Sequence, residues 1–344
     1  MKIIVAPDSF KECLPAREVA SVMAETLRRA LPGVDVVECP LSDGGEGLLD
    51  VLSPVFGGEI RYATVQDPLG KPVLARYLLS GSKALVEVAE ACGLQRMAPA
   101  ERNPLSAHTR GVGELLLEAH RQGARQFLVG LGGSATCDGG AGMLSVPRIR
   151  ETLRDASFEV LYDVDIPCTG SSGAVRCYAP QKGAAPEDLE VLEERMLAQV
   201  KRLERESGIS LADVPGAGAA GGLGAAFAAA FDATLSPGIG RVLTLSGFSG
   251  ALDGASAVIT GEGRSDLQTL SGKVPYGVLQ SCAPSAIPVY LVSGRICNPR
   301  ALLDAGFAQL AEVSPPDLSL HEALERDNAI RNLTLAITRL LPNL

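Results

Sequence analysis

Residues 130–140 read GLGGSATCDGG and directly follow the apolar run Phe127-Leu128-Val129. Glycine loses more backbone entropy on folding than any other residue, so a glycine cluster is favoured where the backbone takes positive φ or approaches another group closely. Two interpretations of this glycine loop stay open: it is a tight connection, or a ligand lies on it. A strand followed by such a loop is typical of α/β sheets, which bind ligands beyond the carboxyl ends of their strands.

The two ends of the chain have the pattern of α/β segments, in which short apolar runs alternate with amphipathic stretches. Strands are predicted at residues 2–6, 34–39, 288–292 and 308–313, and helices at residues 16–30, 298–305 and 320–341. We expect both ends to form one discontinuous α/β domain, residues 1–60 plus 285–344.

The middle of the chain begins with a different pattern. Apolar runs separated by turn-forming residues predict antiparallel strands at residues 60–65, 73–79 and 84–88. Alternation of helix and strand returns after them. We therefore expect residues 61–284 to form an inserted second α/β domain with additional antiparallel strands.

Composition and charge narrow the class of partner. The chain has 344 residues, 46% of them hydrophobic, a net charge of -9 and a pI of about 5.0. Such an acidic chain offers no broad attraction to nucleic acid or to an anionic membrane, so we expect a small-molecule partner. The eight cysteines never have CxxC spacing, which predicts neither a zinc site nor a disulfide framework. The N-terminal apolar run is too short for a secretory signal, so we expect a cytoplasmic protein.

Acidic loops rich in glycine or proline follow several strand-like runs. Backbone N–H groups of glycine turns can bind phosphate, and a carboxylate beside phosphate requires a cation, usually Mg²⁺, between them. The loops therefore predict a nucleotide site with a metal, in which Lys11, Lys182 and Lys273 compensate the charge of phosphoryl transfer. The loops are APDSFK (6–11), PLSDGGEG (40–47), the glycine loop, YDVDIP (162–167) and ITGEGRSD (259–266).

Each of these features also has a purely structural interpretation. SDGGEG can be an Asp-Gly turn before a helix with an acidic first turn. Asp163 and Asp165 alternate along a strand end, so at most one of them need bind a metal. Lys182 and Lys273, taken singly, can be solvated surface charges.

Two segments compete for the role of a dinucleotide loop. GAGAAG (216–221) matches G-x-G-x-x-G, but Val214-Pro215 is a poor strand end. GLGGSA (130–135) does follow a strand, and Glu151 lies about where a ribose-binding acid is expected, so an NAD(P)-dependent hydroxy-acid oxidoreductase is an alternative. Asp138 argues against it, because it would place a negative charge beside the pyrophosphate.

Taken together, the motifs resemble those of the type-1 glycerate kinases. They follow the family's order over nearly the whole chain, and several motifs in that order are highly specific, whereas one alone would not be. Beyond the loops above they include ERNPL with TRGVGEL (101–115), GLGGSATCDGGAGML (130–144), APQKGA (179–184), PGAGAAGGLG (215–224) and ITGEGRSDLQTLSGKVP (259–275).

The resemblance implies ATP-dependent phosphorylation of D-glycerate to 2-phosphoglycerate, or to 3-phosphoglycerate as in some members, with Mg²⁺, in glyoxylate or related organic-acid metabolism. It implies two domains, one discontinuous and one flavodoxin-like, with the active cleft between them, and a homodimer is a possible assembly. A catalytically silent glycerate-binding protein stays an alternative.

The candidate site residues form four groups. The catalytic candidates are Asp8, Lys11, Asp43, Lys182 and Lys273, with Asp8 or Asp43 as the proton acceptor; the nucleotide and phosphate candidates are Gly132, Gly133, Ser134, Thr136, Gly261 and Glu262; the substrate candidates are Ser9, Gly44, Glu46, Arg264 and Asp266; and the metal candidates are Asp138, Asp163 and Asp165.

The chain departs from the family's pattern in two ways. Cys137 and Ile166 lie where the family usually has asparagine, although every carboxylate and lysine of these motifs remains. The family also places a further segment, long enough for a helix and loops, between AGML and the strand before DVD, and this segment is missing at about Val146-Pro147. Either the member is shortened or residues are omitted from the sequence. We favour omission, because abrupt loss of a helix would expose core beside the glycine loop.

Overall fold

The computed structural model describes residues 1–344, which divide into two compact units. The first consists of Met1–Asp43, Asp50–Val55 and Ile239–Leu344, and the second of Gly44–Leu49 and Phe56–Gly238. Residues 239–284 therefore belong with the chain ends, whereas we expected them in the inserted domain. The reason is strand β9 (Ala257–Ser265), which pairs between β1 (Lys2–Pro7) and β10 (Val289–Ile296).

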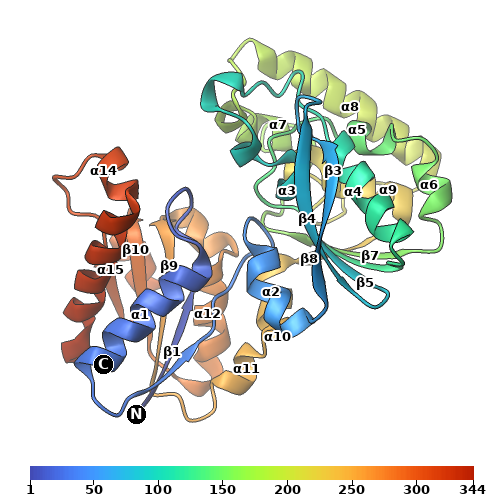
Figure 1. The fold of residues 1–344 in the computed structure, drawn as a ribbon. Helices are drawn as coiled ribbons and strands as arrows, with labels where there is room; N and C mark the ends of the chain where they lie inside the picture. Colours follow the sequence, from blue (N-terminus) through green and yellow to red (C-terminus); the bar gives the residue numbers. More distant parts are fainter. The chain divides into compact units, whose positions relative to one another are not determined.

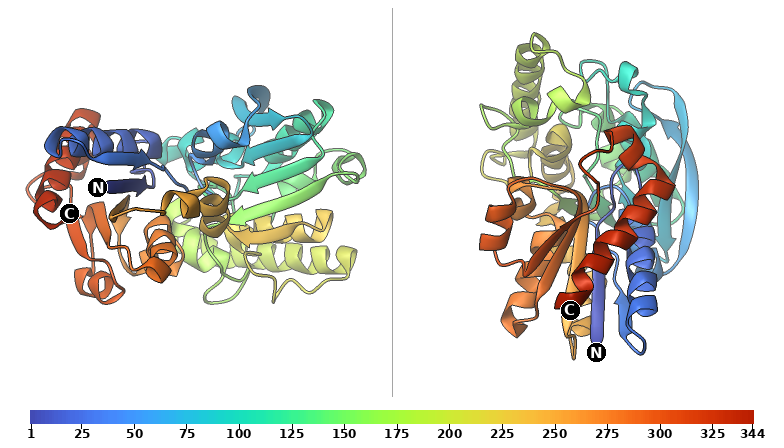
Figure 2. Two further views of the ribbon diagram at one scale, coloured as in Figure 1. Left: turned by 90° about the horizontal axis from the view of Figure 1, so that it is seen from below. Right: turned by 90° about the vertical axis from the view of Figure 1, so that its left-hand side faces the viewer.

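The first unit contains a five-stranded parallel sheet in the order β11-β10-β9-β1-β2 (Figure 1). Helices α1 and α15 cover one face of this sheet, and α12 and α13 cover the other (Figure 2). Besides the three strands named above, the unit has β2 (Asp35–Glu38), β11 (Gln309–Glu312), α1 (Ala16–Ala30), α10 (Gly238–Leu245), α11 (Phe248–Ala251), α12 (Val274–Cys282), α13 (Pro299–Asp304), α14 (Leu320–Leu324) and α15 (Arg326–Leu340).

Helix α1 forms where its apolar residues share one face. Val19, Met23 and Leu27 recur at a spacing of four and are buried in a cluster with Ile3 and Val5 of β1. The cluster also takes in α15, so these two helices bury the same side of the sheet.

The single closing helix that we predicted at residues 320–341 is in fact two helices. Ser319 caps α14 together with Glu322, and Glu325 then takes an extended backbone conformation (φ -62°, ψ 126°) before α15 begins. A residue with this ψ cannot continue a helix, so the chain turns at Glu325.

The second unit contains a six-stranded sheet in the order β3-β4-β5-β6-β7-β8. The antiparallel pairing of β3 with β4 and of β4 with β5 confirms the antiparallel strands predicted from the sequence, and the remaining pairs are parallel. The elements are β3 (Glu59–Gln66), β4 (Pro72–Ser80), β5 (Lys83–Glu87), β6 (Gln126–Gly130), β7 (Ser157–Tyr162), β8 (Thr234–Pro237), α3 (Ala89–Cys92), α4 (Arg110–Arg121), α5 (Ala141–Leu144), α6 (Ile149–Thr152), α7 (Ala174–Tyr178), α8 (Asp188–Ser207) and α9 (Ala219–Phe231), while α2 (Leu48–Phe56) begins in this unit and continues in the first.

The core of the second unit lies against one face of its sheet. Alternate residues of β6 and β7 point into it, and the rings of Phe127 and Phe158 stack with centroids 4.9 Å apart. Helices α4, α8 and α9 contribute side chains to the same cluster. None of the helices in either unit is both long enough and apolar enough to cross a membrane.

The connection between α5 and α6 is the place where the family's further segment is missing. Val146, Ile149 and Leu153 are all buried here in the core of the second unit. A Cβ on Gly113 of α4 would come within 3.0 Å of both Val146 and Ile149, so the short connection packs directly on α4. The short connection therefore leaves no core exposed at this place, contrary to what we expected of a shortened chain. Whether residues are omitted from the sequence stays a prediction.

Candidate active site

In the first unit, charged side chains gather at the carboxyl ends of β1 and β9. Asp8 follows β1, and its N–H donates to the carbonyl of Gly261 on β9 at 2.8 Å. Glu262 is the next residue on β9, and both carboxylates are 6% exposed. Three more candidates interact electrostatically with them. We call this set the Asp8 group: Asp8, Lys11, Asp43, Glu262 and Lys273.

The environment of Asp8 favours its protonated form. Burial raises the pKa of Asp8 well above its ordinary value, and the negative charge of Asp43 raises it further. Lys11 and a hydrogen bond from the Ser9 N–H (2.6 Å) oppose this rise. A carboxylate with a raised pKa is suited to accept a proton from a hydroxyl group near neutral pH.

Hydroxyl groups fix the orientation of Glu262. Its Oε1 accepts hydrogen bonds from Ser265 Oγ (2.9 Å) and Thr269 Oγ1 (2.6 Å), and Ser293 Oγ lies 2.6 Å from Ser265 Oγ. Its Oε2 lies 3.5 Å from Nζ of Lys273. Burial raises the pKa of Glu262, and Lys273 opposes that rise. No motif in the sequence points to Ser293, which lies in the separate strand β10.

Two substrate candidates of the first unit have other observed partners. Asp266 caps the 3-10 helix Leu267–Ser271, and its Oδ1 accepts the Gln268 N–H at 2.9 Å. The side chain of Arg264 is 69% exposed and lies 3.5 Å from Asp266. Their roles in substrate binding stay predictions.

In the second unit, close packing explains most glycines of the glycine loop. A Cβ on Gly130 would lie 2.5 Å from the Gly44 carbonyl oxygen, and one on Gly132 would lie 2.4 Å from Cα of Gly45. Gly139 and Gly140 have positive φ. A Cβ on Gly139 would lie 2.7 Å from Gln199 of α8, and one on Gly140 would lie 2.3 Å from Ala226 of α9. These glycines therefore allow the loop to pack on other parts of the chain, as the tight-connection interpretation expects.

Replacing Gly132 by alanine is expected to lower the free energy of unfolding by about 1–3 kcal/mol, because the added methyl group overlaps the backbone of Gly45. Urea denaturation measures the change. Gly240→Ala is the control, since no atom lies within 4 Å of its added Cβ. An equal midpoint for Gly132→Ala and the parent protein would show that the loop can move away from residues 44–45.

Neither dinucleotide-loop candidate has the full context that such a loop requires, although GLGGSA does follow β6. No strand precedes GAGAAG, and a Cβ on Gly216 or Gly221 would lie 2.2 Å from the Tyr162 ring or 2.0 Å from the Thr136 carbonyl oxygen. Glu151, the proposed ribose acid of the other candidate, forms an exposed ion pair with Arg148. Packing again explains the glycines of 216–221.

Lys182 brings a buried positive charge to the glycine loop. It ends the 3-10 helix Pro180–Lys182 and is 4% exposed. Its Nζ donates to Ser134 Oγ (3.1 Å) and to the Thr136 carbonyl oxygen (2.8 Å), which are both neutral. The Thr136 side chain is buried, and the Cys92 thiol is its neighbour. A buried charge is costly unless it is paired, so this arrangement is suited to an anionic ligand.

The three metal candidates differ in their surroundings. Asp138 accepts hydrogen bonds from Thr109 N (2.9 Å), Thr109 Oγ1 (2.9 Å), Gly140 N (3.1 Å) and Gly142 N (2.9 Å), so it fastens the glycine loop to α4 and α5. Asp165 accepts a hydrogen bond from the Gly216 N–H. Asp163 lies beside Gly132, where an added Cβ would be 3.4 Å from its Oδ2. Nowhere in residues 1–344 are three or more histidine, cysteine or carboxylate side chains grouped to hold a metal ion. Their metal-binding roles stay predictions.

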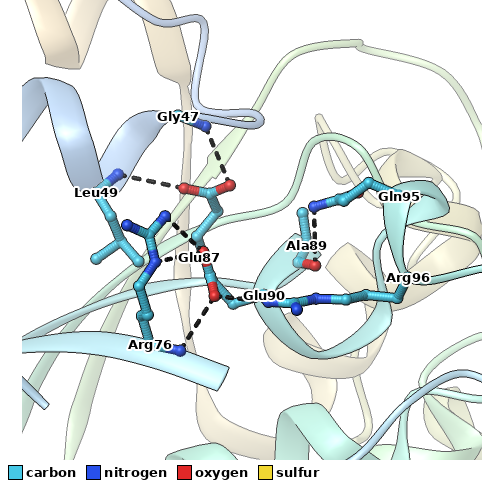
Figure 3. A network of polar contacts seen from close by, with 8 residues as sticks. All are labelled: Gly47, Leu49, Arg76, Glu87, Ala89, Glu90, Gln95 and Arg96. Atoms are coloured by element: carbon cyan, nitrogen blue, oxygen red, sulfur yellow. Dashed lines mark hydrogen bonds and ion pairs between the residues drawn. The ribbon is translucent and has the colours of Figure 1, made fainter. Parts of the chain in front are cut away.

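Two carboxylates that no sequence motif indicated are Glu87, at the end of β5, and Glu90, on α3 (Figure 3). Glu87 accepts the N–H groups of Gly47 (3.1 Å) and Leu49 (3.2 Å), one on each carboxylate oxygen. Glu90 is bound by Arg76 and Arg96, each at 2.8 Å. Burial raises the pKa of Glu87 to about 8. The available signal was the position of Glu87 at a strand end, next to the strand that leads into the glycine loop.

Comparison with known proteins agrees with the resemblance of the motifs. The sequence model of the glycerate kinase family matches residues 3–146 and 145–342, and the two segments meet at the shortened connection. The chain is 36% identical to the glycerate kinase of Halalkalibacterium halodurans, over 95% of this chain and 94% of that protein. It is 35% identical to the glycerate 2-kinase of Escherichia coli K12, over 98% of both chains. A crystal structure described as a candidate glycerate kinase 2 of Salmonella typhimurium LT2 superposes with a TM-score of 0.79 at 36% identity, over 100% of this chain and 98% of that one. With matches of this extent and identity, the chain belongs to the glycerate kinase family.

Proposed function

We propose that this kinase transfers the γ-phosphoryl group of ATP to a hydroxyl group of D-glycerate, with Mg²⁺, and forms 2-phosphoglycerate. The observation that carries the proposal is the buried ammonium group of Lys182, whose partners Ser134 and Thr136 are neutral. The name of the Escherichia coli relative, glycerate 2-kinase, supports the choice of product.

The second unit binds the phosphoryl group in this proposal. Lys182 Nζ and the hydroxyl groups of Ser134 and Thr136 are donors that a phosphate oxygen can use, with the backbone of Gly132 and Gly133 beside them. Phosphoryl transfer depends mainly on positioning and on stabilisation of developing negative charge, which a buried cation supplies.

The first unit handles the proton and the acid substrate in this proposal. Asp8 accepts the proton of the attacking hydroxyl group, because burial and Asp43 raise its proton affinity. Lys11 binds the glycerate carboxylate as a point charge. Glu262, held by Ser265 and Thr269, orients the ammonium group of Lys273.

The residues present fit a magnesium ion that arrives with the nucleotide. Mg²⁺ is usually held by one or two protein carboxylates together with phosphate oxygens and water, which agrees with the absence of a larger ligand cluster. Asp163, over Gly132 of the glycine loop, is the carboxylate we assign to this role. Bound there, the ion would neutralise charge on the phosphate oxygens.

A phosphorus NMR spectrum of the product formed from D-glycerate and Mg-ATP tests the proposal. A new monoester resonance matching 2-phosphoglycerate, with equal formation of ADP, is expected. A resonance matching 3-phosphoglycerate would show that the enzyme phosphorylates the other hydroxyl group of glycerate. Absence of ADP and of any ester, with glycerate binding intact, would favour a silent glycerate-binding protein.

A further inference from the structure

The segment 44–49 is packed on the glycine loop by close backbone contacts. Its Gly44 carbonyl oxygen accepts the Gly132 N–H at 3.3 Å. The close approach of its glycines to Gly130 and Gly132 leaves no room for a side chain there. Two substrate candidates, Gly44 and Glu46, lie in this segment.

Glu87 connects the segment 44–49 to the sheet of the second unit. Glu87 ends β5 opposite Gly130, the last residue of β6. Both of its oxygens accept N–H groups of the segment, from Gly47 and Leu49 (Figure 3). The amides at the start of α2 would otherwise be without an intrahelical partner, so a single carboxylate satisfies two of them.

We propose that Glu87 is a positioning residue, which holds the segment 44–49 on the glycine loop in the geometry that the reaction needs. It touches neither substrate nor nucleotide, and acts through the two amides. The part of the proposal that concerns the reaction rests on the proposed function. The part that concerns the segment rests on the hydrogen bonds alone.

The neighbouring charges determine how firmly Glu87 holds its proton. Glu90 on α3 and Glu46 in the segment both raise its pKa, after the larger effect of burial, while the two amides lower it. Arg76 and Arg96 neutralise Glu90 by ion pairs. The amides are therefore the only close partners that favour the charged form of Glu87, and they bind it more strongly once it is ionised.

Hydrogen exchange tests the positional part of the proposal. In the full-length parent protein, the Gly47 and Leu49 amides are expected to exchange at least a hundredfold more slowly than in an unstructured peptide. Glu87→Gln keeps the size of the side chain and one acceptor oxygen. At a pH above 8, where the carboxylate of the parent protein is ionised, it is expected to accelerate exchange at one or both amides at least tenfold. Glu90→Gln is the matched control, because Glu90 contacts the two arginines and not the segment. Unprotected amides in the parent protein, or equal exchange in Glu87→Gln, would overturn the proposal, and the parent measurement decides even if the variant does not fold.

Kinetics test the part that concerns the reaction. Because a displacement of the segment misplaces Gly44 and Glu46, Glu87→Gln is expected to raise the KM for D-glycerate about tenfold at a pH above 8, where the parent's Glu87 is ionised, with a smaller effect on kcat. An unchanged KM would show that the segment need not be held for the reaction. If the parent protein forms no phosphoglycerate, the proposed function fails, while the exchange experiment still decides whether Glu87 holds the segment.

The pH dependence of stability provides a readout specific to the carboxyl group. With a folded pKa of about 8 and an ordinary value of 4.5, Glu87 is protonated in the folded state and ionised in the unfolded state between these pH values. Stability is therefore lost as the pH rises through this window. The urea midpoint of the parent protein is expected to fall more steeply between pH 5 and pH 8.5 than that of Glu87→Gln. Parallel curves would contradict a raised pKa at this position.

Discussion

Replacing Lys182 by methionine is expected to lower kcat/KM for glycerate phosphorylation by about 10²–10³-fold, the usual cost of removing one preorganised donor from a developing negative charge. The ammonium group is buried and bonded only to Ser134 and Thr136, so water cannot easily replace it. A coupled assay for ADP measures the loss.

The fold of the Lys182→Met variant should remain intact, because an unbranched apolar side chain of similar length replaces a buried charge without leaving an ionised partner behind. Its thermal midpoint is expected to equal or exceed that of the parent protein. Lys83→Met, at an exposed position that begins β5, is the control and should keep full activity. If the activity of Lys182→Met were within threefold of that of the parent protein, Lys182 would not act on the transferring phosphoryl group.

Replacing Asp8 by asparagine is expected to lower kcat by about 10²–10⁴-fold, because the amide cannot accept the proton of the attacking hydroxyl group. The parent protein should show an acidic limb in its pH–rate profile that reports the raised pKa of Asp8. This limb should be absent from the residual activity of the variant. If the Asp8→Asn variant kept the acidic limb of the parent protein, a group other than Asp8 would be the proton acceptor.

Asp43→Asn separates the two carboxylates of the Asp8 group. The negative charge of Asp43 raises the pKa of Asp8, so its removal should move the acidic limb to lower pH. If Asp43 is instead the proton acceptor, its replacement should abolish activity across the pH range. Measurement of kcat against pH in the two variants therefore distinguishes the two assignments that the sequence left open.

Helix α1 and the antiparallel strand pairs could be predicted because each depends on residues that are close together in the sequence. The spacing of apolar residues predicted α1, and the turn residues at 67–70 and 80–82 predicted the antiparallel pairs of the second unit. The assignment of residues 239–284 could not be predicted in this way. Whether β9 pairs with β1 depends on contacts between residues about 250 positions apart, which leave no trace in the spacing of apolar residues.

The sequence indicated which residues come together in the candidate site better than it indicated what each of them does. Five charged candidates meet in the Asp8 group, and Lys182 lies at the glycine loop. However, a glycine that accommodates a ligand and a glycine that accommodates a neighbouring backbone look alike in sequence, as Gly132 shows. Asp138 illustrates the same limit, since a carboxylate that caps backbone amides cannot be distinguished from a metal ligand by its motif. Glu87 was missed because its partners lie about 40 residues away.

The pairing of β1 with β9 has a consequence for synthesis on the ribosome. Strand β1 is translated about 250 residues before β9, its neighbour on one side. By then the continuous stretch Phe56–Gly238 is complete and able to fold, because domains generally fold as units during translation. Strand β1 therefore completes its pairing only after the sequence of the second unit has been synthesised, and the cluster that buries Ile3 and Val5 stays incomplete until then.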